Sequence, residues 1–445
     1  MLLVLALGTL APHCAPALAR DRAEAAQPFG SALRGEIARR AGSDIAPFYA
    51  ARGNRPLWLS GDGRPTLATE ALLKLFDTAE ADGVKPSKLK LRAIQKALDG
   101  ARSGDPMQAA RAELALSKSF TTYVKAMREL RRGGMIYESR ALAPAAPTPV
   151  SALQAAANAR ALKTYVDTLG WMHPLYAPTR AALGGPRLDP VRRRQILANL
   201  SRLRALPANP ASRYVLIDAA GARLWMYENG RPVDSMKVVV GKPDQQTPMM
   251  AGFLRYAIVN PYWNVPVDLV RDRIAHNVLD KGLGYLANGG YQVLSDWTDR
   301  ATVVDPRRVD WREVASGDRE LRVRQLPGGD NFMGKAKFMF PNAQGIYLHD
   351  TPDKGLMAKD ARQFSSGCVR LEDASRFGRW LLKRPLPRSS SPEQHVALTE
   401  LVPVYITYLT VLPEKGRLAF RDDVYGRDDP RGRKDRDARL ADARP

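Results

Sequence analysis

Cysteine and histidine, the side chains that most often bind transition metals, are scarce in this sequence. The 445 residues include two cysteines and five histidines. A zinc site needs about four ligands at recognisable spacing, and the chain has no HExxH, CxxC or clustered-histidine pattern. Phosphate-binding glycine motifs are also missing, because GGDNFMG and NGG are typical of turns. We therefore predict no metal and no cofactor, and we interpret His173, His276 and His395 as structural or surface residues.

Long apolar runs are missing too, and the most informative short one lies near the N-terminus. Residues 2–10, LLVLALGTL, are too few to span a bilayer, and the A-x-A cleavage pattern of APALA follows them. This arrangement predicts a signal peptide over residues 1–19 and localisation in the periplasm or cell envelope. Cleavage there would remove Cys14 and leave Cys368 alone, so no stable disulfide partner is expected.

A lone cysteine in an exported protein needs a reason. Free cysteine is among the most buried residue types, so Cys368 could be a small core residue. A redox-sensing thiol is a second interpretation, although its resolving cysteine would have to come from another molecule. A nucleophile activated by His349 is the third. The neighbours of Cys368 are small, polar or charged and do not favour an apolar shell: Ser365, Ser366, Gly367 and Arg370.

Positive charge is in excess, with a formal net charge of +22 at pH 7. Such an excess raises nucleic acid as a class of partner. The basic residues lie in helical contexts such as VKAMRELRRGG (124–134), however, without interleaved aromatic residues or a zinc-finger spacing. We therefore predict no nucleic-acid partner. Attraction to an anionic cell envelope and a merely solvated basic surface remain as alternatives.

The first half of the chain has a helical period of apolar residues. TLATEALLKLFDTAEADG predicts a helix that ends at Gly83. Asp189 and Pro190 are typical of an N-cap and first turn, and an apolar stripe follows them up to Leu206. We therefore predict a helical domain over residues 20–206.

After Pro210 the period changes to that of strands. RYVLID, RLWMYE and MKVVVG predict strands, and Asn229-Gly230 is a strong hairpin signal. We predict a mostly β domain over residues 207–420. Within it, residues 266–335 lose the strand pattern, which is typical of an insertion that covers a site or decorates an edge. Residues 421–445 carry dense mixed charge and are predicted to be a disordered tail.

The residues around Cys368 suit nucleophilic chemistry. A thiol is mostly protonated at neutral pH, and cationic or helix N-terminal groups such as Arg370 and the helix predicted just after it lower the thiol pKa. His349 closes the apolar strand GIYL and would act as the base. Gly367 allows a tight turn that aims amide N–H groups at an oxyanion. The group that orients His349 is left open between Asp350 and a backbone carbonyl.

These motifs resemble a known family. HDT (349–351) with SSGCVR (365–370) resembles the catalytic signature of the L,D-transpeptidases, whose catalytic domain is of the YkuD type. Further blocks resemble the large, YcbB-like branch of that family: FYAARGNRPLWLSGDG (48–63), GKPDQQTP (241–248), NPYWNVP (260–266) and KFMFPN (337–342). Two features depart from the pattern. Ser366 stands where the general motif has histidine, and only residues 182–190 occupy the place of a peptidoglycan-binding module.

The resemblance implies a multidomain α+β fold, in which a helical N-terminal scaffold domain precedes a mostly β L,D-transpeptidase catalytic domain with an inserted capping subdomain. It implies that Cys368 attacks a peptidoglycan tetrapeptide stem before its terminal D-Ala. An amine of a second stem then forms a 3→3 cross-link, with His349 as the base. Carbapenems are expected to acylate the cysteine. An L,D-carboxypeptidase and a non-catalytic envelope scaffold are the alternatives.

Supporting roles are also implied for several residues. The amides of Gly367 and Cys368 would form the oxyanion hole, and Arg370 would hold local geometry or a substrate carboxylate. Further active-site support is expected from Ser365, Ser366 and Asp350. The candidates for substrate contact are Tyr347, Trp263 and Phe340.

Overall fold

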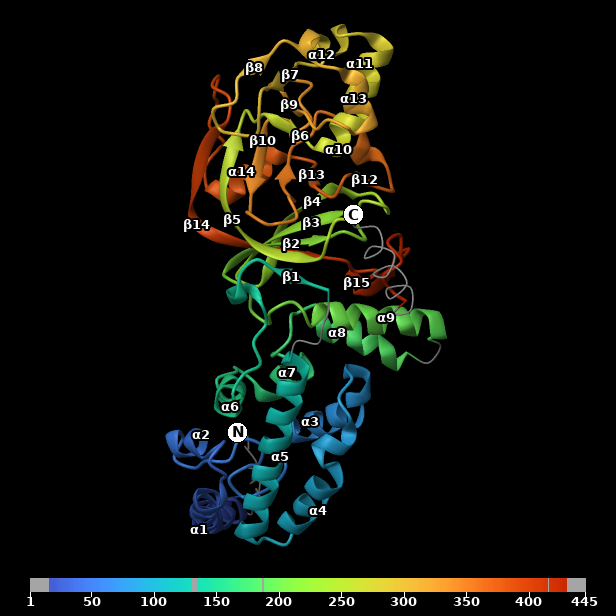
Figure 1. The fold of residues 1–445 in the computed structure, drawn as a ribbon. Coiled ribbons are helices and arrows are strands. Elements are labelled where there is room, and N and C mark those ends of the chain that lie inside the picture. Colours follow the sequence, from blue (N-terminus) through green and yellow to red (C-terminus); the bar gives the residue numbers. More distant parts are fainter. Residues whose placement is uncertain (1–15, 130–133, 186–187, 415, 430–445) are drawn as a thin grey trace, which may run out of the picture. The chain divides into compact units, whose positions relative to one another are not determined.

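The computed structural model describes residues 16–129, 134–185, 188–414 and 416–429, which form two compact units (Figure 1). The first unit lies within residues 1–131 and 144–186, and the second within 132–143 and 187–445. Residues 1–15 of the predicted signal peptide lie outside the described residues. In the described part of the chain, none of the helices combines the length and apolar character that crossing a bilayer requires.

The first unit is helical, as the sequence predicts. Apart from α1, its longest described helix is α5 (Pro106–Arg128). Asp105 caps the N-terminus of α5, and its side chain accepts a hydrogen bond from the Met107 N–H. The other α-helices of this unit are α1 (Pro16–Arg40), α2 (Ala46–Ala51), α3 (Leu67–Asp77), α4 (Leu91–Ala101), α6 (Pro149–Ala157), α7 (Leu162–Asp167) and α8 (Tyr176–Ala181).

A buried carboxylate fastens the segment FYAARGNRPLW to α5. Glu113 is fully buried, and its oxygens accept hydrogen bonds from the backbone N–H groups of Leu57 at 2.7 Å, Trp58 at 3.0 Å and Leu59 at 3.0 Å. The Tyr49 hydroxyl donates a fourth bond at 2.6 Å. The carboxylate therefore satisfies backbone N–H groups of this loop that would otherwise need a neighbouring strand as partner.

The second unit is built on one large sheet whose pairing closes on itself. Its strand order is β1-β5-β10-β11-β13-β4-β3-β2-β14, and β14 pairs with β5 as well as with β2. The strands of this sheet are β1 (Ile136–Tyr137), β2 (Arg213–Asp218), β3 (Arg223–Glu228), β4 (Arg231–Gly241), β5 (Met250–Val259), β10 (Ala336–Met339), β11 (Leu348–His349), β12 (Gln363–Ser365), β13 (Val369–Leu371) and β14 (Gln394–Thr407).

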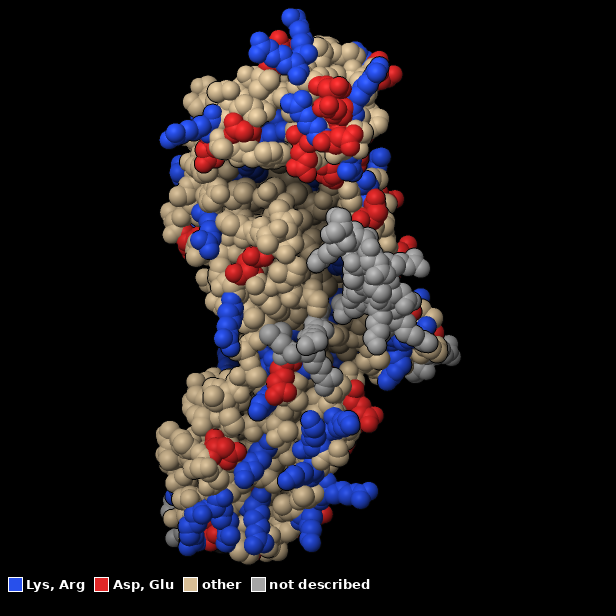
Figure 2. Space-filling model, in the orientation of Figure 1, with Lys and Arg blue, Asp and Glu red and all other residues tan. Residues whose placement is uncertain are grey.

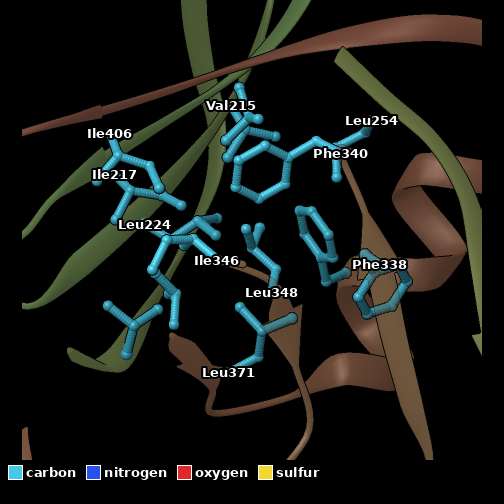
Figure 3. Packing of buried hydrophobic residues seen from close by; sticks show 14 of the residues in the cluster. Val215, Ile217, Leu224, Leu254, Phe338, Phe340, Ile346, Leu348, Leu371 and Ile406 are labelled. Carbon is cyan, nitrogen blue, oxygen red and sulfur yellow. The ribbon is translucent and has the colours of Figure 1, made fainter. Parts of the chain in front are cut away.

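The inner side of this sheet forms a continuous apolar core (Figure 3). Val215 and Ile217 of β2, Leu254 of β5 and Leu348 of β11 contribute to it. Phe340 lies in the same core with no exposed surface, and a side-chain carbon added at Gly252 would come within 2.7 Å of its ring. The prediction that Phe340 contacts substrate is therefore wrong, because its ring is enclosed by the core.

Helix α9 (Pro190–Leu203) belongs to the second unit, so the division of the chain lies before this helix and not at residue 206. The predicted cap is present, since the Asp189 side chain accepts hydrogen bonds from the first-turn N–H groups. Asn199 donates to the Thr410 hydroxyl at 2.7 Å, just before the hairpin of β15 (Val411–Glu414) and β16 (Arg417–Phe420). Polar contacts on α9 thus place it with the second unit, which the apolar period alone could not reveal.

Residues 421–429 are ordered, in contrast to the predicted disordered tail. Arg421 pairs with the fully buried Asp218, and Arg202 of α9 bonds Asp428 at 2.7 Å. Tyr425 is buried against the sheet core. The charged residues of 421–429 therefore bond buried side chains elsewhere in the unit. Residues 430–445 lie outside the described residues.

The predicted insertion forms a small subdomain with its own sheet and core (Figure 1). Its core includes residues from Trp263 to Met333, so it begins slightly earlier than residue 266. Its strand order is β6-β9-β7-β8. Its elements are β6 (Trp263–Val265), α10 (Val267–Leu269), a π-helical turn (Val270–Ala275), α11 (His276–Lys281), α12 (Gly284–Asn288), β7 (Tyr291–Leu294), β8 (Val303–Val304), α13 (Trp311–Ser316) and β9 (Arg322–Gln325).

Charges of both signs share the molecular surface. Figure 2 shows lysine and arginine side chains over both units on one face, with acidic side chains gathered among them over the insertion. A groove for nucleic acid would need a continuous basic stripe. On the face shown, the positive excess is dispersed, which favours a solvated basic surface or a diffuse attraction to anionic polymers.

Candidate active site

The two short strands β11 and β13 bring the sequence-predicted residues together. They pair in parallel, with Leu348 opposite Val369 and His349 opposite Arg370. Leu348 and Val369 are fully buried in the sheet core, so the residues that alternate with them point to the other face. That face carries Tyr347 and His349 from one strand and Cys368 and Arg370 from the next. We call these four residues the catalytic-face cluster.

His349 is held as a neutral base by a backbone carbonyl. Its Nδ1 lies 2.6 Å from the carbonyl oxygen of Asp350, and because a carbonyl can only accept, Nδ1 carries the proton. Nε2 is left unprotonated and makes no hydrogen bond to the described residues. Burial, and next the nearby guanidinium of Arg370, lower the pKa of His349 to about 3. The group that orients the histidine is thus a carbonyl, the second of the two predicted options.

The surroundings of Cys368 favour the protonated form of its thiol. The side chain is half-buried, and its Sγ donates toward the Gly345 carbonyl at 3.6 Å. Burial raises the pKa of the thiol above its usual value and outweighs the lowering effects of the Tyr347 N–H and Arg370. This direction is opposite to the one expected from Arg370 and the helix after it, because desolvation exceeds the attraction of one guanidinium. Any nucleophilic reaction of Cys368 would begin with loss of the thiol proton.

The turn before the cysteine is closed by Ser365. Its hydroxyl donates to the Cys368 carbonyl at 2.6 Å and accepts the Gly367 N–H at 3.2 Å. Gly367 has a φ of +111°, which favours glycine. The Gly367 N–H already has a partner, which argues against its predicted role as an oxyanion donor. The Cys368 N–H makes no hydrogen bond to any described residue and remains available, while Ser366 is exposed.

Arg370 brings an unpaired cation to the catalytic face. Its Nε is buried, and its guanidinium has no hydrogen bond or ion pair within the part of the chain that is described. Arg273 of the insertion lies near enough to lower the pKa of Arg370 further, after burial itself. Arg273 packs over the Phe332 ring at 4.9 Å. Two guanidinium groups from separate parts of the unit therefore converge on one region, and the sequence offered no signal for Arg273.

Asp350 has its side chain turned away from the histidine. Its carboxylate accepts hydrogen bonds from the Lys335 N–H at 2.9 Å and from Lys354 Nζ at 2.6 Å. Gly334, with a φ of +60°, lies so close that an added side-chain carbon would be 2.6 Å from this carboxylate. The carboxylate therefore fixes the backbone whose carbonyl holds His349. A cavity of about 1520 Å³ adjoins it, lined among others by Thr351, Lys354 and Arg376.

Two further features complete the account of the site. Trp263 has 8% of its surface exposed and packs on Phe332 with ring centroids 4.6 Å apart, so it is a core residue of the insertion and the predicted substrate contact is wrong. Tyr347 is half-buried beside Cys368, and its role as a substrate contact stays a prediction. Among the described residues, no group of three or more histidine, cysteine, aspartate or glutamate side chains could hold a metal ion.

Comparison with known proteins identifies the class. Residues 212–405 match the family model of the L,D-transpeptidase catalytic domain (YkuD), and residues 43–183 match that of the Scaffold domain. The chain has an L,D-transpeptidase catalytic domain of the YkuD family preceded by a Scaffold domain, which is the YcbB-like arrangement. The predicted family and the predicted class of fold are confirmed.

One curated protein and two solved structures were found to be similar to parts of this chain. A curated protein of Haemophilus influenzae named "Putative L,D-transpeptidase" is 26% identical over 400 residues, which are 86% of this chain and 78% of that protein. The solved "Structure of the Ldtfm-avibactam carbamoyl enzyme" is 12% identical with a TM-score of 0.21, and "L,D-transpeptidase from Mycobacterium smegmatis" is 11% identical with a TM-score of 0.23. Those two alignments cover 45% and 44% of this chain, and 51% and 58% of the solved chains.

Proposed function

We propose that this protein is a peptidoglycan L,D-transpeptidase that forms 3→3 cross-links through an acyl-enzyme on Cys368. Its substrate class follows from the family, since L,D-transpeptidases act on peptidoglycan stem peptides. One observation carries the assignment of residues. The Nδ1–H of His349 is donated to the Asp350 carbonyl, which leaves Nε2 as an unprotonated base on the sheet face that also bears Cys368.

The first half of the reaction makes a thioester. As the Cys368 sulfur attacks the carbonyl carbon between the third residue and the terminal D-Ala of the donor stem, its proton passes to Nε2 of His349. The carbonyl oxygen becomes an oxyanion that the Cys368 N–H can stabilise. When the C–N bond breaks, the proton moves from His349 to the leaving amine of D-Ala. A positioned base contributes on the order of 10²–10⁴ in rate to such steps.

The second half returns the thiol. The side-chain amine of a second stem attacks the thioester carbon and gives its proton to Nε2 of His349. The C–S bond then breaks, and the sulfur takes that proton back. Arg370, assisted by Arg273, orients a carboxylate of the donor stem, because an unpaired guanidinium is well suited to a planar anion. If water replaced the amine, the same residues would perform L,D-carboxypeptidase chemistry.

The remaining proposals concern the setting of the reaction. We infer that the signal peptide predicted over residues 1–19 directs export and that the protein acts in the periplasm or cell envelope. The anionic polymers of the envelope would attract the excess positive charge of the chain. The insertion caps the catalytic face and limits access of water to the thioester. Carbapenems acylate Cys368, because their strained carbonyl meets the same nucleophile and oxyanion donor.

Product analysis tests this function. The purified protein is incubated with disaccharide-tetrapeptide, and the products are identified by mass. We expect loss of D-Ala and formation of 3→3 dimers, with a transient protein adduct on Cys368. Tripeptides without dimers would point to the carboxypeptidase. Binding to sacculi without any adduct would point to a non-catalytic envelope scaffold and would refute the proposal.

A further inference from the structure

The direction of the Cys368 N–H is set by the carbonyl of the same peptide group. In a trans peptide the C=O and N–H point in opposite directions, so whatever holds the Gly367 carbonyl also aims the Cys368 N–H. The hydroxyl of Thr247 donates to the Gly367 carbonyl oxygen at 2.7 Å. Thr247 lies 120 residues before Gly367 and is fully buried. It therefore acts on the nucleophile's amide from outside the SSGCVR turn.

Thr247 is itself fixed by a tight turn. Its hydroxyl oxygen accepts the Gly241 N–H at 2.8 Å, so one hydroxyl joins the end of β4 to the turn before Cys368. A side-chain carbon at Gly241 would lie 2.1 Å from the Gln245 carbonyl oxygen and 2.6 Å from the Thr247 nitrogen. Since such contacts with backbone are forbidden, only glycine allows the chain to fold back here and present Thr247.

The ordered C-terminal segment braces this turn from the other side. The Tyr425 hydroxyl donates to the Gly241 carbonyl at 2.5 Å. Arg427 donates from Nε to the Gln246 side chain at 2.9 Å and from its terminal nitrogen to the Thr247 carbonyl at 3.2 Å. The Arg427 guanidinium also packs over the Tyr425 ring at 4.8 Å. The turn that carries Thr247 is thus held between β4 and residues 425–427.

We propose that Thr247 is a positioning residue that aims the Cys368 N–H at the developing oxyanion, and that Tyr425 and Arg427 hold Thr247 in place. This inference rests on the proposed acyl-enzyme. Because the Gly367 N–H bonds Ser365, a single backbone donor, the Cys368 N–H, remains for the oxyanion. Contacts at both ends of the turn fix its orientation. The C-terminal segment thereby contributes to catalysis without contacting substrate.

Two reactions of the Cys368 sulfur distinguish an effect on the orientation of the Cys368 N–H from an effect on the accessibility of the thiol. Acylation by disaccharide-tetrapeptide develops an oxyanion, whereas alkylation by iodoacetamide displaces iodide from a saturated carbon and develops none. Thr247→Val should lower the acylation rate constant by about 10²–10³, as loss of one oxyanion donor does, and leave the alkylation rate unchanged. Thr247→Ser, which keeps the hydroxyl, should restore most of the acylation rate.

Control variants make the test specific. Thr407→Val removes the hydroxyl of another fully buried threonine, one whose oxygen has no partner among the described residues, and should change neither rate. Tyr425→Phe keeps the ring and loses the hydroxyl that donates to the Gly241 carbonyl and accepts from the Thr247 N–H, so acylation should fall several-fold even if Thr247→Val fails to fold. Circular dichroism verifies folding of each variant.

The outcomes distinguish this inference from the proposed function. A wild-type protein that alkylates but never acylates would overturn the function itself. Wild-type acylation with equal rates in folded Thr247→Val, or in Tyr425→Phe where the valine variant does not fold, would overturn only the positioning role. A parallel fall of acylation and alkylation would also overturn it, because the thiol and not the amide would then be displaced.

Discussion

Both units bury polar groups, but they treat them differently. In the first unit Glu113 is fully buried and receives hydrogen bonds from three backbone N–H groups and the Tyr49 hydroxyl. In the second unit, three groups of the catalytic-face cluster have no hydrogen-bond partner among the described residues: the Cys368 N–H, Nε2 of His349 and Nε of Arg370. Buried polar groups usually find partners, so an orphaned set deserves a functional explanation. Single unpartnered atoms occur elsewhere in both units, such as Nε1 of Trp171, but the catalytic-face cluster gathers several such groups on one face.

Removal of the nucleophile should give the largest effect. In Cys368→Ala we expect no covalent adduct with disaccharide-tetrapeptide or with a carbapenem, because the attacking sulfur is gone. The midpoint of thermal unfolding should change little, since the side chain is small and half-buried. Intact-protein mass spectrometry and calorimetry measure the two quantities. An adduct that persists in this variant would remove Cys368 from the mechanism.

Replacement of the base should give the next largest effect. His349→Gln keeps a polar side chain but cannot take the thiol proton, so turnover should fall by about 10²–10⁴. Asp350→Asn is the matched control, because the carbonyl that holds His349 survives in it and turnover should fall less than about tenfold. Steady-state product formation compares the two. Equal losses would show that the carboxylate, and not the carbonyl, supports the base.

Removal of the buried Glu113 carboxylate should lower the stability of the first unit and leave the reaction of Cys368 unchanged. Glu113→Ala leaves three buried N–H groups without acceptors, each costing about 1–3 kcal/mol, so the unfolding free energy of the first unit should fall by several kcal/mol. The acylation rate of Cys368 per folded molecule should not change. Urea unfolding followed by acylation assays tests both, with the exposed Glu80→Ala as control. A stable Glu113→Ala protein would contradict the structural role.

Acidification should act on both units alike and by a smaller amount. Each unit buries one histidine, His173 and His349, and burial followed by a nearby arginine lowers the pKa of both to about 3. The folded pKa is below the unfolded value of about 6.5, so the neutral ring stabilises each unit above pH 6.5, and this stability is lost as the pH falls toward 3. From pH 6.5 to 4.5 each histidine should cost about 2–3 kcal/mol.

Single variants assign that loss to its unit. Unfolding free energies at pH 6.5, 5.5 and 4.5 should depend less on pH for the first unit in His173→Gln and for the second in His349→Gln. His395→Gln, at an exposed position, should behave as wild type. Unchanged pH dependence in both core variants would argue against neutral buried rings.

Local signals in the sequence predicted the helices and strands well. They predicted poorly which residues meet in the folded protein. β2 and β3 have the predicted bounds, and the Asp189 cap is present at α9, because periodicity and capping act over a few residues. His349 and Cys368 were also predicted, from residue type and motif. That they share a face depends on the parallel register of β11 and β13, which no local pattern encodes.

The wrong predictions have a common physical origin. Phe340 and Trp263 are aromatic residues near motifs, but tertiary packing encloses them in two different cores. The raised pKa of the Cys368 thiol was not foreseen, because desolvation depends on neighbours that are distant in sequence. Residues 421–429 were assigned to disorder by composition, yet their charges have buried partners such as Asp218.

The closed pairing of the sheet has a consequence for how the enzyme matures. β5 pairs with β1 and with β10, which in turn pairs with β11, and β5 gains its long pairing with β14 only at residues 394–407. Contacts this distant along the chain form late, because a long loop must close before they are gained. During synthesis Cys368 therefore lies on an unassembled chain, and the face that it shares with His349 is complete only when β14 has paired with β5.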